Sequence, residues 1–156
     1  MKIKLKKLIY WIPTAVWLIF MFIASSFTVD ETSGRNIFGI IGSFIRRNLY
    51  RFDNEFLHLI AGNTDKVYHS AEYLVFSILL YRSLSGSFDY PVSKNITIAA
   101  SSVITIAAID EMHQIFIKSR SCTLGDFFAD LIGMMIVYII IGLINIKRRN
   151  NELQAH

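Results

Sequence analysis

Four stretches of mostly apolar residues, each roughly 20 residues long, constrain this chain more than any other feature. They are Leu8–Phe27, Val67–Leu84, Asn95–Ile117 and Asp126–Ile146. A helix of about 20 apolar residues matches the hydrocarbon core of a bilayer, which is about 30 Å thick. Charged residues make up 18% of the 156 residues, below the roughly 25% that is usual for a soluble domain. The sequence therefore predicts an all-α, polytopic membrane protein, with four transmembrane helices in a single domain over residues 1–156.

Basic residues cluster at both ends of the chain and predict its orientation. They are Lys2, Lys4, Lys6 and Lys7 at one end, and Lys147, Arg148 and Arg149 at the other. Because basic flanks resist translocation, we expect both termini to be cytoplasmic in a multi-pass protein of the cell membrane. Four external arginines count against this orientation, namely Arg35, Arg46, Arg47 and Arg51. The net charge of +4 thus reports topology, and we expect no nucleic-acid partner.

Two segments need a choice between readings. Lys2–Lys7 and the apolar run after it have the general form of a signal peptide, but about 20 apolar residues exceed the usual core of 7–15, so we expect an uncleaved helix.

In residues 37–60, apolar residues recur every three or four positions, opposite a face that carries Arg46, Arg47 and His58. This pattern predicts an amphipathic helix on the outer membrane surface. An irregular loop is the alternative.

Ionisable residues in the predicted spans gather at one end of the bundle. Each costs roughly 2.5–3.5 kcal/mol at the centre of a membrane helix, so their placement calls for a reason. With both termini inside, the acids and histidines of these spans lie at the outer end and only Arg82 lies in the cytoplasmic half, and helical spacing puts each set on one face. Together with the loop residue Arg120, a five-donor fork suited to carboxylate or phosphate, they predict a polar site. The candidate residues are Asp65, Lys66, His69, Glu72, Asp110, Glu111, His113, Gln114, Arg120, Asp126 and Asp130.

The same residues carry a resemblance to a known family. The strings Asp65-Lys66-x-x-His69-x-x-Glu72-Tyr73 and Asp110-Glu111-x-His113-Gln114-x-Phe116-x-x-x-Arg120, followed by Asp126-x-x-x-Asp130-x-x-Gly133, resemble the VanZ-like membrane proteins. Ser25-Ser26 also fits that pattern, whereas Asp130 stands where many relatives have Asn. The resemblance covers most of the chain and implies a bacterial membrane protein connected with resistance to the glycopeptide teicoplanin. It implies no molecular activity.

Several functions fit these residues. The first is a binding module for an envelope lipid, a lipid-linked cell-wall component or a glycopeptide, with the head group at Lys66, Arg120 and the histidines. The second is an acid/base or metal-dependent enzyme that acts on such a molecule. No HExxH motif, zinc-type Cys/His spacing or serine elbow is present, so no metal ligands are assigned and no cofactor is specified. A proton-coupled transporter and a purely structural polar network are the remaining alternatives, and the sequence sets no oligomeric state.

Overall fold

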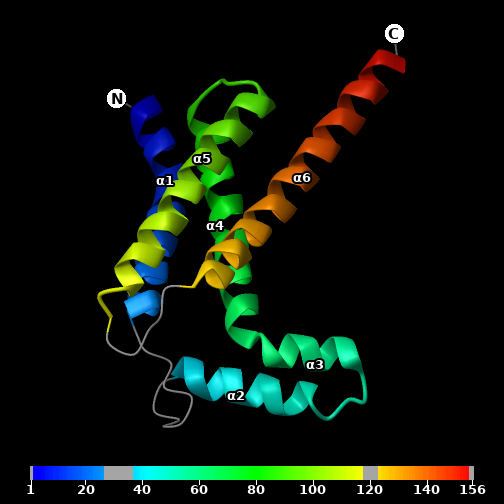
Figure 1. Ribbon diagram of the computed structural model, residues 1–156. Helices are drawn as coiled ribbons and strands as arrows, with labels where there is room; N and C mark the ends of the chain where they lie inside the picture. The colour runs from blue at the N-terminus through cyan, green and yellow to red at the C-terminus, as the bar shows by residue number, and fades with distance from the viewer. Residues whose placement is uncertain (1, 27–36, 118–122, 155–156) are drawn as a thin grey trace.

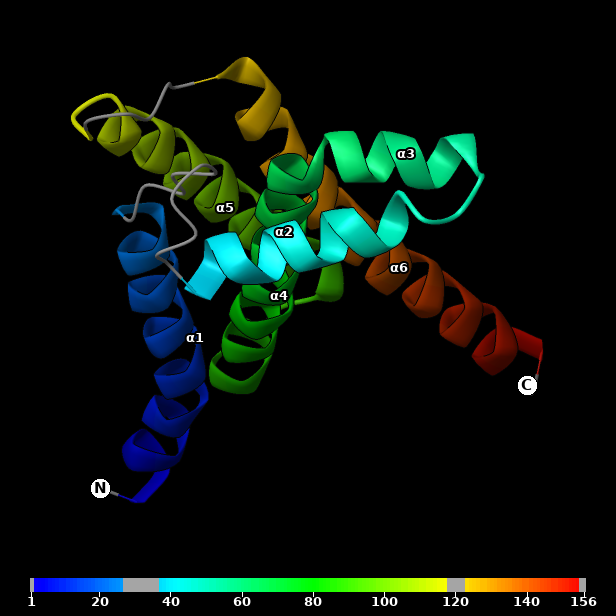
Figure 2. The ribbon, with the colours of Figure 1, turned by 90° about the horizontal axis from the view of Figure 1, so that it is seen from below.

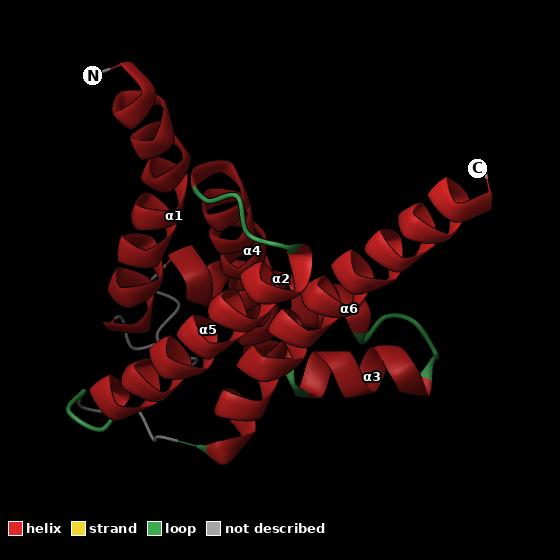
Figure 3. Ribbon diagram, turned by 90° about the horizontal axis from the view of Figure 1, so that it is seen from above, coloured by secondary structure: helices red, strands yellow, loops and turns green. Residues whose placement is uncertain are grey.

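The computed structural model describes residues 2–26, 37–117 and 123–154, and within these ranges every regular element is a helix (Figures 1 and 3). The predicted all-α fold is therefore confirmed. The helices are α1 (Lys2–Ser26), α2 (Ile37–Leu49), α3 (Glu55–Gly62), α4 (Thr64–Ser87), α5 (Val92–Gln114) and α6 (Leu124–Gln154).

Helix α4 is the centre of the bundle and packs against α1, α5 and α6. Both termini lie at one end of the bundle, and α2 and α3 cross its other end (Figures 1 and 2). The core lies along α4, where Tyr73 and Phe76 are almost fully buried. On α5, Ala99, Val103 and Ala107 recur every four residues and are also buried. These small side chains on one face of α5 permit close packing at the core.

Three helices are long and apolar enough to cross a membrane. They are Lys7–Ser26 of α1, Val92–Gln114 of α5 and Leu124–Gln154 of α6. Helix α4 has 24 residues, which is sufficient length, but it does not belong to this group. The reason is its position: because three helices surround it, α4 buries serines such as Ser77 and Ser83 where a lipid-facing helix would carry apolar side chains.

The helix bounds differ from all four predicted spans, as the C-terminal ends of α5 and α6 illustrate. The third predicted span extended to Ile117, but α5 ends at Gln114 and gives way to a turn closed by a hydrogen bond from Ile117 N to Gln114 O (3.1 Å). The fourth was expected to end at Ile146, whereas α6 continues to Gln154. At about 1.5 Å per residue, its 31 residues exceed the thickness of a hydrocarbon core.

The single amphipathic helix expected over residues 37–60 is wrong in extent, because the structure divides it into α2 and α3. The break has a local cause. Asn54 has an extended backbone, and its side chain accepts hydrogen bonds from Phe56 N (2.9 Å) and Leu57 N (3.3 Å). An asparagine cap of this kind starts a new helix and prevents α2 from continuing. Both helices expose large apolar side chains, including Phe44 and Phe56.

Polar contacts join α1 to α4 near the end that carries the termini. The indole Nε1 of Trp11 donates to Ser87 Oγ at 2.8 Å, and the hydroxyls of Thr14 and Ser83 are 2.7 Å apart. Hydrogen bonds between membrane helices contribute about 0.6 kcal/mol each on average. They therefore help to fix the pairing of α1 with α4.

Candidate functional site

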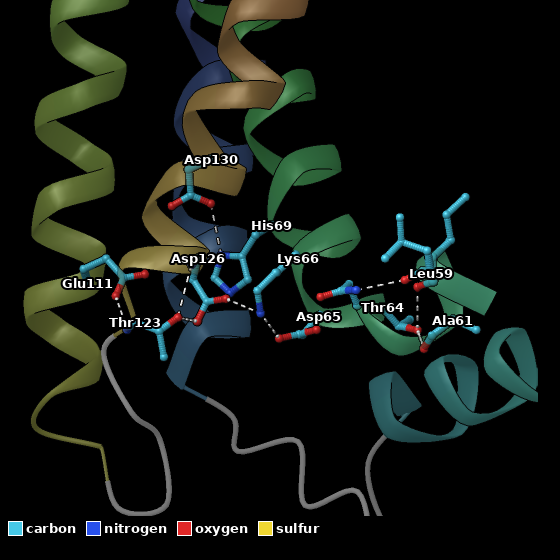
Figure 4. Close-up of polar contacts among 12 residues, drawn as sticks. Leu59, Ala61, Thr64, Asp65, Lys66, His69, Glu111, Thr123, Asp126 and Asp130 are labelled. Atoms are coloured by element: carbon cyan, nitrogen blue, oxygen red, sulfur yellow. Dashed lines mark hydrogen bonds and ion pairs between the residues drawn. The ribbon is translucent and has the colours of Figure 1, made fainter. Parts of the chain in front are cut away.

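The predicted polar residues lie at the end of the bundle opposite the termini, where α4, α5 and α6 meet (Figures 1 and 4). Five of them are almost completely buried, although their side chains are charged or carry an amide. These five are Asp110, Glu111, Gln114, Asp126 and Asp130. Buried carboxylates are costly unless hydrogen bonds or opposite charges compensate them, so the partners of each one define the site.

His69 of α4 and Asp130 of α6 form a buried polar pair between the two helices. Their Nδ1 and Oδ1 atoms are 3.1 Å apart, and Asp130 has a relative exposure of 0%. The pair depends on the close approach of α4 and α6 at Gly133, where a Cβ atom would lie 2.1 Å from the backbone oxygen of Ser70. A carboxylate that holds one nitrogen of an imidazole fixes the orientation of the ring, as in the histidines of acid/base catalysts.

Thr123 connects α5 with the start of α6. Its backbone N donates to Glu111 Oε2 at 3.1 Å, and its hydroxyl donates to Asp126 Oδ2 at 2.6 Å. The Asp126 backbone N in turn donates to Thr123 Oγ1 at 3.2 Å. The hydrogen bond from the Asp126 amide makes Thr123 the N-cap of α6. Thr123 thus holds the carboxylates of Glu111 and Asp126 on its two sides (Figure 4).

Lys66 lies between two carboxylates at the outer edge of the site. Its Nζ is 3.1 Å from Asp65 Oδ2 and 3.7 Å from Asp126 Oδ1. Burial by itself raises the pKa of the Asp65 carboxyl, but the hydrogen bonds and the positive charge of Lys66 outweigh it and hold that pKa below its ordinary value of 3.8. The hydrogen bond to Asp65 raises the pKa of Lys66 above its ordinary value of 10.5.

The polar residues at this end of the bundle form a layer across it, which we call the polar layer. A second part of this layer faces α1. The amide nitrogen of Gln114 donates to Ser25 Oγ (3.2 Å) and to Asp110 Oδ2 (3.1 Å). His113 Nε2 lies 3.1 Å from Ser26 Oγ. The spacing of α5 explains the division, because neighbouring positions on a helix face in different directions. Asp110 and Gln114, four residues apart, share a hydrogen bond, while Glu111 bonds to the start of α6.

Tyr73 and Glu72 lie on α4 at the centre of the bundle. The Tyr73 side chain is almost fully buried, and its hydroxyl has no hydrogen-bond partner among the described residues. Glu72 is half-buried, and its backbone oxygen accepts a hydrogen bond from Trp17 Nε1 at 3.1 Å, which joins α1 to α4.

Several carboxylates of the site use only one of their two oxygens. Asp110 Oδ1, Glu111 Oε1 and Asp130 Oδ2 are buried and have no hydrogen-bond partner among the described residues. In Figure 4 the Glu111 carboxylate points from α5 toward α6, and the Asp130 carboxylate points from α6 toward His69. An ionised carboxylate can only accept hydrogen bonds. The free oxygens therefore suit ammonium or hydroxyl groups of a ligand better than an anion.

The structure brings together most of the predicted site residues, but in two neighbouring groups rather than around a single centre. Lys66, His69, Glu111, Asp126 and Asp130 gather between α4, α5 and α6, and Asp110, His113 and Gln114 extend toward α1. Asp65 is mostly exposed at the edge. The predicted residue Arg120 lies outside the described residues, as does Cys122.

Thr123 belongs to the candidate site, although the sequence motifs did not point to it. Its signal was present, because a threonine directly before an apolar run is a typical N-cap. Ser25 was noted only as part of the family resemblance, and the structure adds its contact with Gln114.

The described ranges contain no group of three or more His, Cys, Asp or Glu side chains arranged to hold a metal ion. The buried acids lie in pairs on α5 and α6, and Glu111, Asp130 and Asp110 are hydrogen-bonded to Thr123, His69 and Gln114, respectively.

No curated protein and no solved structure gives a significant match to this chain. The family comparison is positive and agrees with the motifs that form the polar layer. The sequence profile described as VanZ/LLP1 matches residues 10–145, which include most of α1, the polar layer and most of α6. This chain therefore belongs to the VanZ/LLP1 family.

Proposed function

We propose that α4 crosses the membrane together with α1, α5 and α6, so that the chain has four crossings and both termini in the cytoplasm. Both termini lie at the same end of the bundle, which requires an even number of crossings (Figure 1). That end carries the basic residues Lys147, Arg148 and Arg149, as expected for cytoplasmic flanks. The polar layer then lies on the outer side of the cell membrane.

Helices α2 and α3 fit the outer membrane surface in this topology. They cross the end of the bundle (Figure 2). Their exposed side chains combine aromatic residues such as Phe44 and Phe56 with Arg47. Apolar rings beside basic groups are typical of helices that lie in the membrane interface.

Single-cysteine labelling tests this topology in cells. In a Cys122→Ser background, a membrane-impermeant maleimide should label Glu55→Cys on α3 and should not label Glu152→Cys on α6 until the membrane is opened. Labelling of both positions, or of Glu152→Cys alone in intact cells, would contradict the proposed orientation.

The polar layer is best suited to bind the head group of an amphiphile of the cell envelope: a lipid, a lipid-linked cell-wall component or a glycopeptide such as teicoplanin. The observation that carries this proposal is the set of buried carboxylate oxygens at Glu111 and Asp130 that have no hydrogen-bond partner in the described ranges. Leaving a buried acceptor unpaired costs about 1–3 kcal/mol. A ligand that donates hydrogen bonds to these oxygens recovers that cost, and the surrounding bilayer supplies ligands with apolar tails.

Binding measurements test this proposal with the purified protein in detergent. Native mass spectrometry would follow phosphatidylethanolamine, phosphatidylglycerol, undecaprenyl phosphate and teicoplanin. We expect at least one of these to bind, and about tenfold weaker binding by Glu111→Gln and Asp130→Asn, because each replaces an acceptor pair with an amide. Asp89→Asn, an exposed acid of the opposite loop, is the matched control. If none of the four binds, or if all variants bind equally, the proposal is wrong.

A second candidate function, acid/base catalysis on the same class of ligand, is favoured by the His69–Asp130 pair alone. A carboxylate-oriented imidazole is a suitable general base. Incubation of the bound amphiphile with the protein, followed by mass analysis, should then show a product that His69→Gln does not form. An unchanged ligand mass after incubation with the unaltered protein would leave binding as the function.

A further inference from the structure

A groove between α4 and α6 opens at the side of the bundle, next to the polar layer. Its volume is about 430 Å³, within the range of roughly 300–1,000 Å³ that is common for small-molecule sites. Its lining includes Asn63, Lys66, Val67, Leu74, Phe128 and Ile132. Asn63 is the N-cap of α4 and Lys66 lies in its first turn, whereas Leu74 and Ile132 lie deeper along the two helices. The groove is thus polar at one end and apolar along its length.

The side chain of Lys66 is arranged to face a ligand in this groove. Its ammonium group has three donors, and the structure places Asp65 and Asp126 beside it. With 39% of the side chain exposed, the group remains accessible to a third acceptor. Gly125 leaves room for the Lys66 side chain, because a Cβ at position 125 would lie 3.0 Å from Lys66 Cε.

The charges around Lys66 select the type of head group. One lysine between two carboxylates has a net charge of about −1 when all three are ionised. A head group that carries only negative charge is therefore repelled, although Lys66 offers a donor to its phosphate. A head group with both a phosphate and an ammonium satisfies both signs: the phosphate accepts from Lys66, and the ammonium donates to Asp65 or Asp126.

We propose that the α4–α6 groove binds one acyl chain of a zwitterionic phospholipid of the phosphatidylethanolamine type, with the phosphate at Lys66 and the ammonium at the neighbouring carboxylates. The chain lies against Val67, Leu74, Phe128 and Ile132, in contact with the surrounding bilayer. This inference rests on the proposed binding function and names its ligand class and its route of entry, which is lateral from the membrane.

The test uses the purified full chain in detergent and native mass spectrometry with three lipids that have identical acyl chains: phosphatidylethanolamine, phosphatidylcholine and phosphatidylglycerol. We expect phosphatidylethanolamine to bind tightest, since phosphatidylcholine lacks ammonium protons and phosphatidylglycerol lacks the positive charge. Lys66→Gln should weaken its binding about tenfold, and Lys66→Arg should retain it. Lys94→Gln, at the opposite end of α5, is the charge control.

A second pair of variants tests the groove itself. Ile132→Trp fills the groove and should reduce binding of phosphatidylethanolamine, whereas Ile109→Trp places the same ring on α5, which does not line the groove, and should not. Both positions are about half exposed, so a comparable effect on folding is expected from each. Comparison of the two variants therefore distinguishes a loss of binding caused by filling the groove from one caused by reduced stability.

The possible outcomes separate this inference from the proposed function. Equal binding of phosphatidylglycerol and phosphatidylethanolamine, or unchanged binding by both Lys66→Gln and Ile132→Trp, would overturn the groove assignment alone. Binding of undecaprenyl phosphate or teicoplanin without any phospholipid would do the same and would leave the proposed function standing. If no amphiphile binds, the proposed function itself fails, and this inference fails with it.

Discussion

Gly133 of α6 lies so close to Ser70 of α4 that no side chain fits between the two backbones. A Cβ at position 133 would be 2.1 Å from Ser70 O and 2.9 Å from Leu74 N. Both obstructing atoms belong to the backbone, so no change of rotamer relieves the clash. This contact lies one turn from the His69–Asp130 pair and beside the α4–α6 groove. It therefore sets the separation of the helices that carry both features.

Gly133→Ala should destabilise the protein by about 1–3 kcal/mol, the usual cost of inserting a methyl group into packed structure. The helices must move apart, so the His69–Asp130 hydrogen bond should also lengthen, with a change in the His69 ring signals in NMR. Thermal unfolding in detergent measures the first effect. Gly142→Ala on the same helix is the control, because no atom lies within 4 Å of a Cβ there. Equal stability of the two variants would contradict the close packing of α4 on α6.

Removal of His69 should be more harmful than removal of the whole His69–Asp130 pair. His69→Leu leaves the fully buried Asp130 carboxylate without its partner, which commonly costs about 3–5 kcal/mol for a buried charge pair. The double variant His69→Leu/Asp130→Leu removes that charge and should recover much of the loss. A double-mutant cycle of unfolding free energies measures the coupling. Simple additivity of the single and double variants would show that the two side chains do not interact.

Thr123→Ala should weaken the start of α6 by about 1 kcal/mol, the typical value of a lost helix cap. The hydroxyl contact with Asp126 (2.6 Å) disappears, whereas the hydrogen bond from the backbone N of residue 123 to Glu111 is retained. Thr123→Ser restores a hydroxyl and should recover the stability. Hydrogen exchange of the Asp126 amide gives a local readout, and unchanged protection in Thr123→Ala would argue against the cap.

The Asp65–Lys66 pair should stabilise the fold over a defined pH window. The pKa of Asp65 is lowered from 3.8, so its contribution is complete above that pH and is lost as the pH falls through the lowered value. The pKa of Lys66 is raised from 10.5, so its contribution is complete below that pH and is lost as the pH rises further. The difference in unfolding free energy between the protein and Asp65→Asn should be constant within this window and should shrink outside it. Because both side chains are partly exposed, the difference should be small and sensitive to salt. A difference that grows below pH 3.8 would contradict the assignment.

The polar layer shows which features of the site the spacing of the motifs could predict and which it could not. Three clusters of polar residues on three apolar helices can only be buried together at one end of a bundle, and the structure places them there. The spacing did not show that Glu111 faces α6 while Asp110 and Gln114 face α1, because the rotation of α5 about its own axis depends on how it packs against α4. Nor could it show that Lys66 is placed between Asp65 and Asp126, since Asp126 belongs to another helix.

The sequence by itself determined that this chain is helical and membrane-associated, because runs of about 20 apolar residues leave few other structures open to it. It also predicted that the polar residues lie together at one end of the bundle, since charged residues in such helices almost always face the bundle interior. Only the tertiary structure decided which carboxylate meets which partner, that α2 and α3 are separate helices, and that a groove opens beside Lys66. These features depend on distances between segments far apart in the chain, above all on the contact between Gly133 and Ser70. Periodicity along a single helix carries no information about such distances.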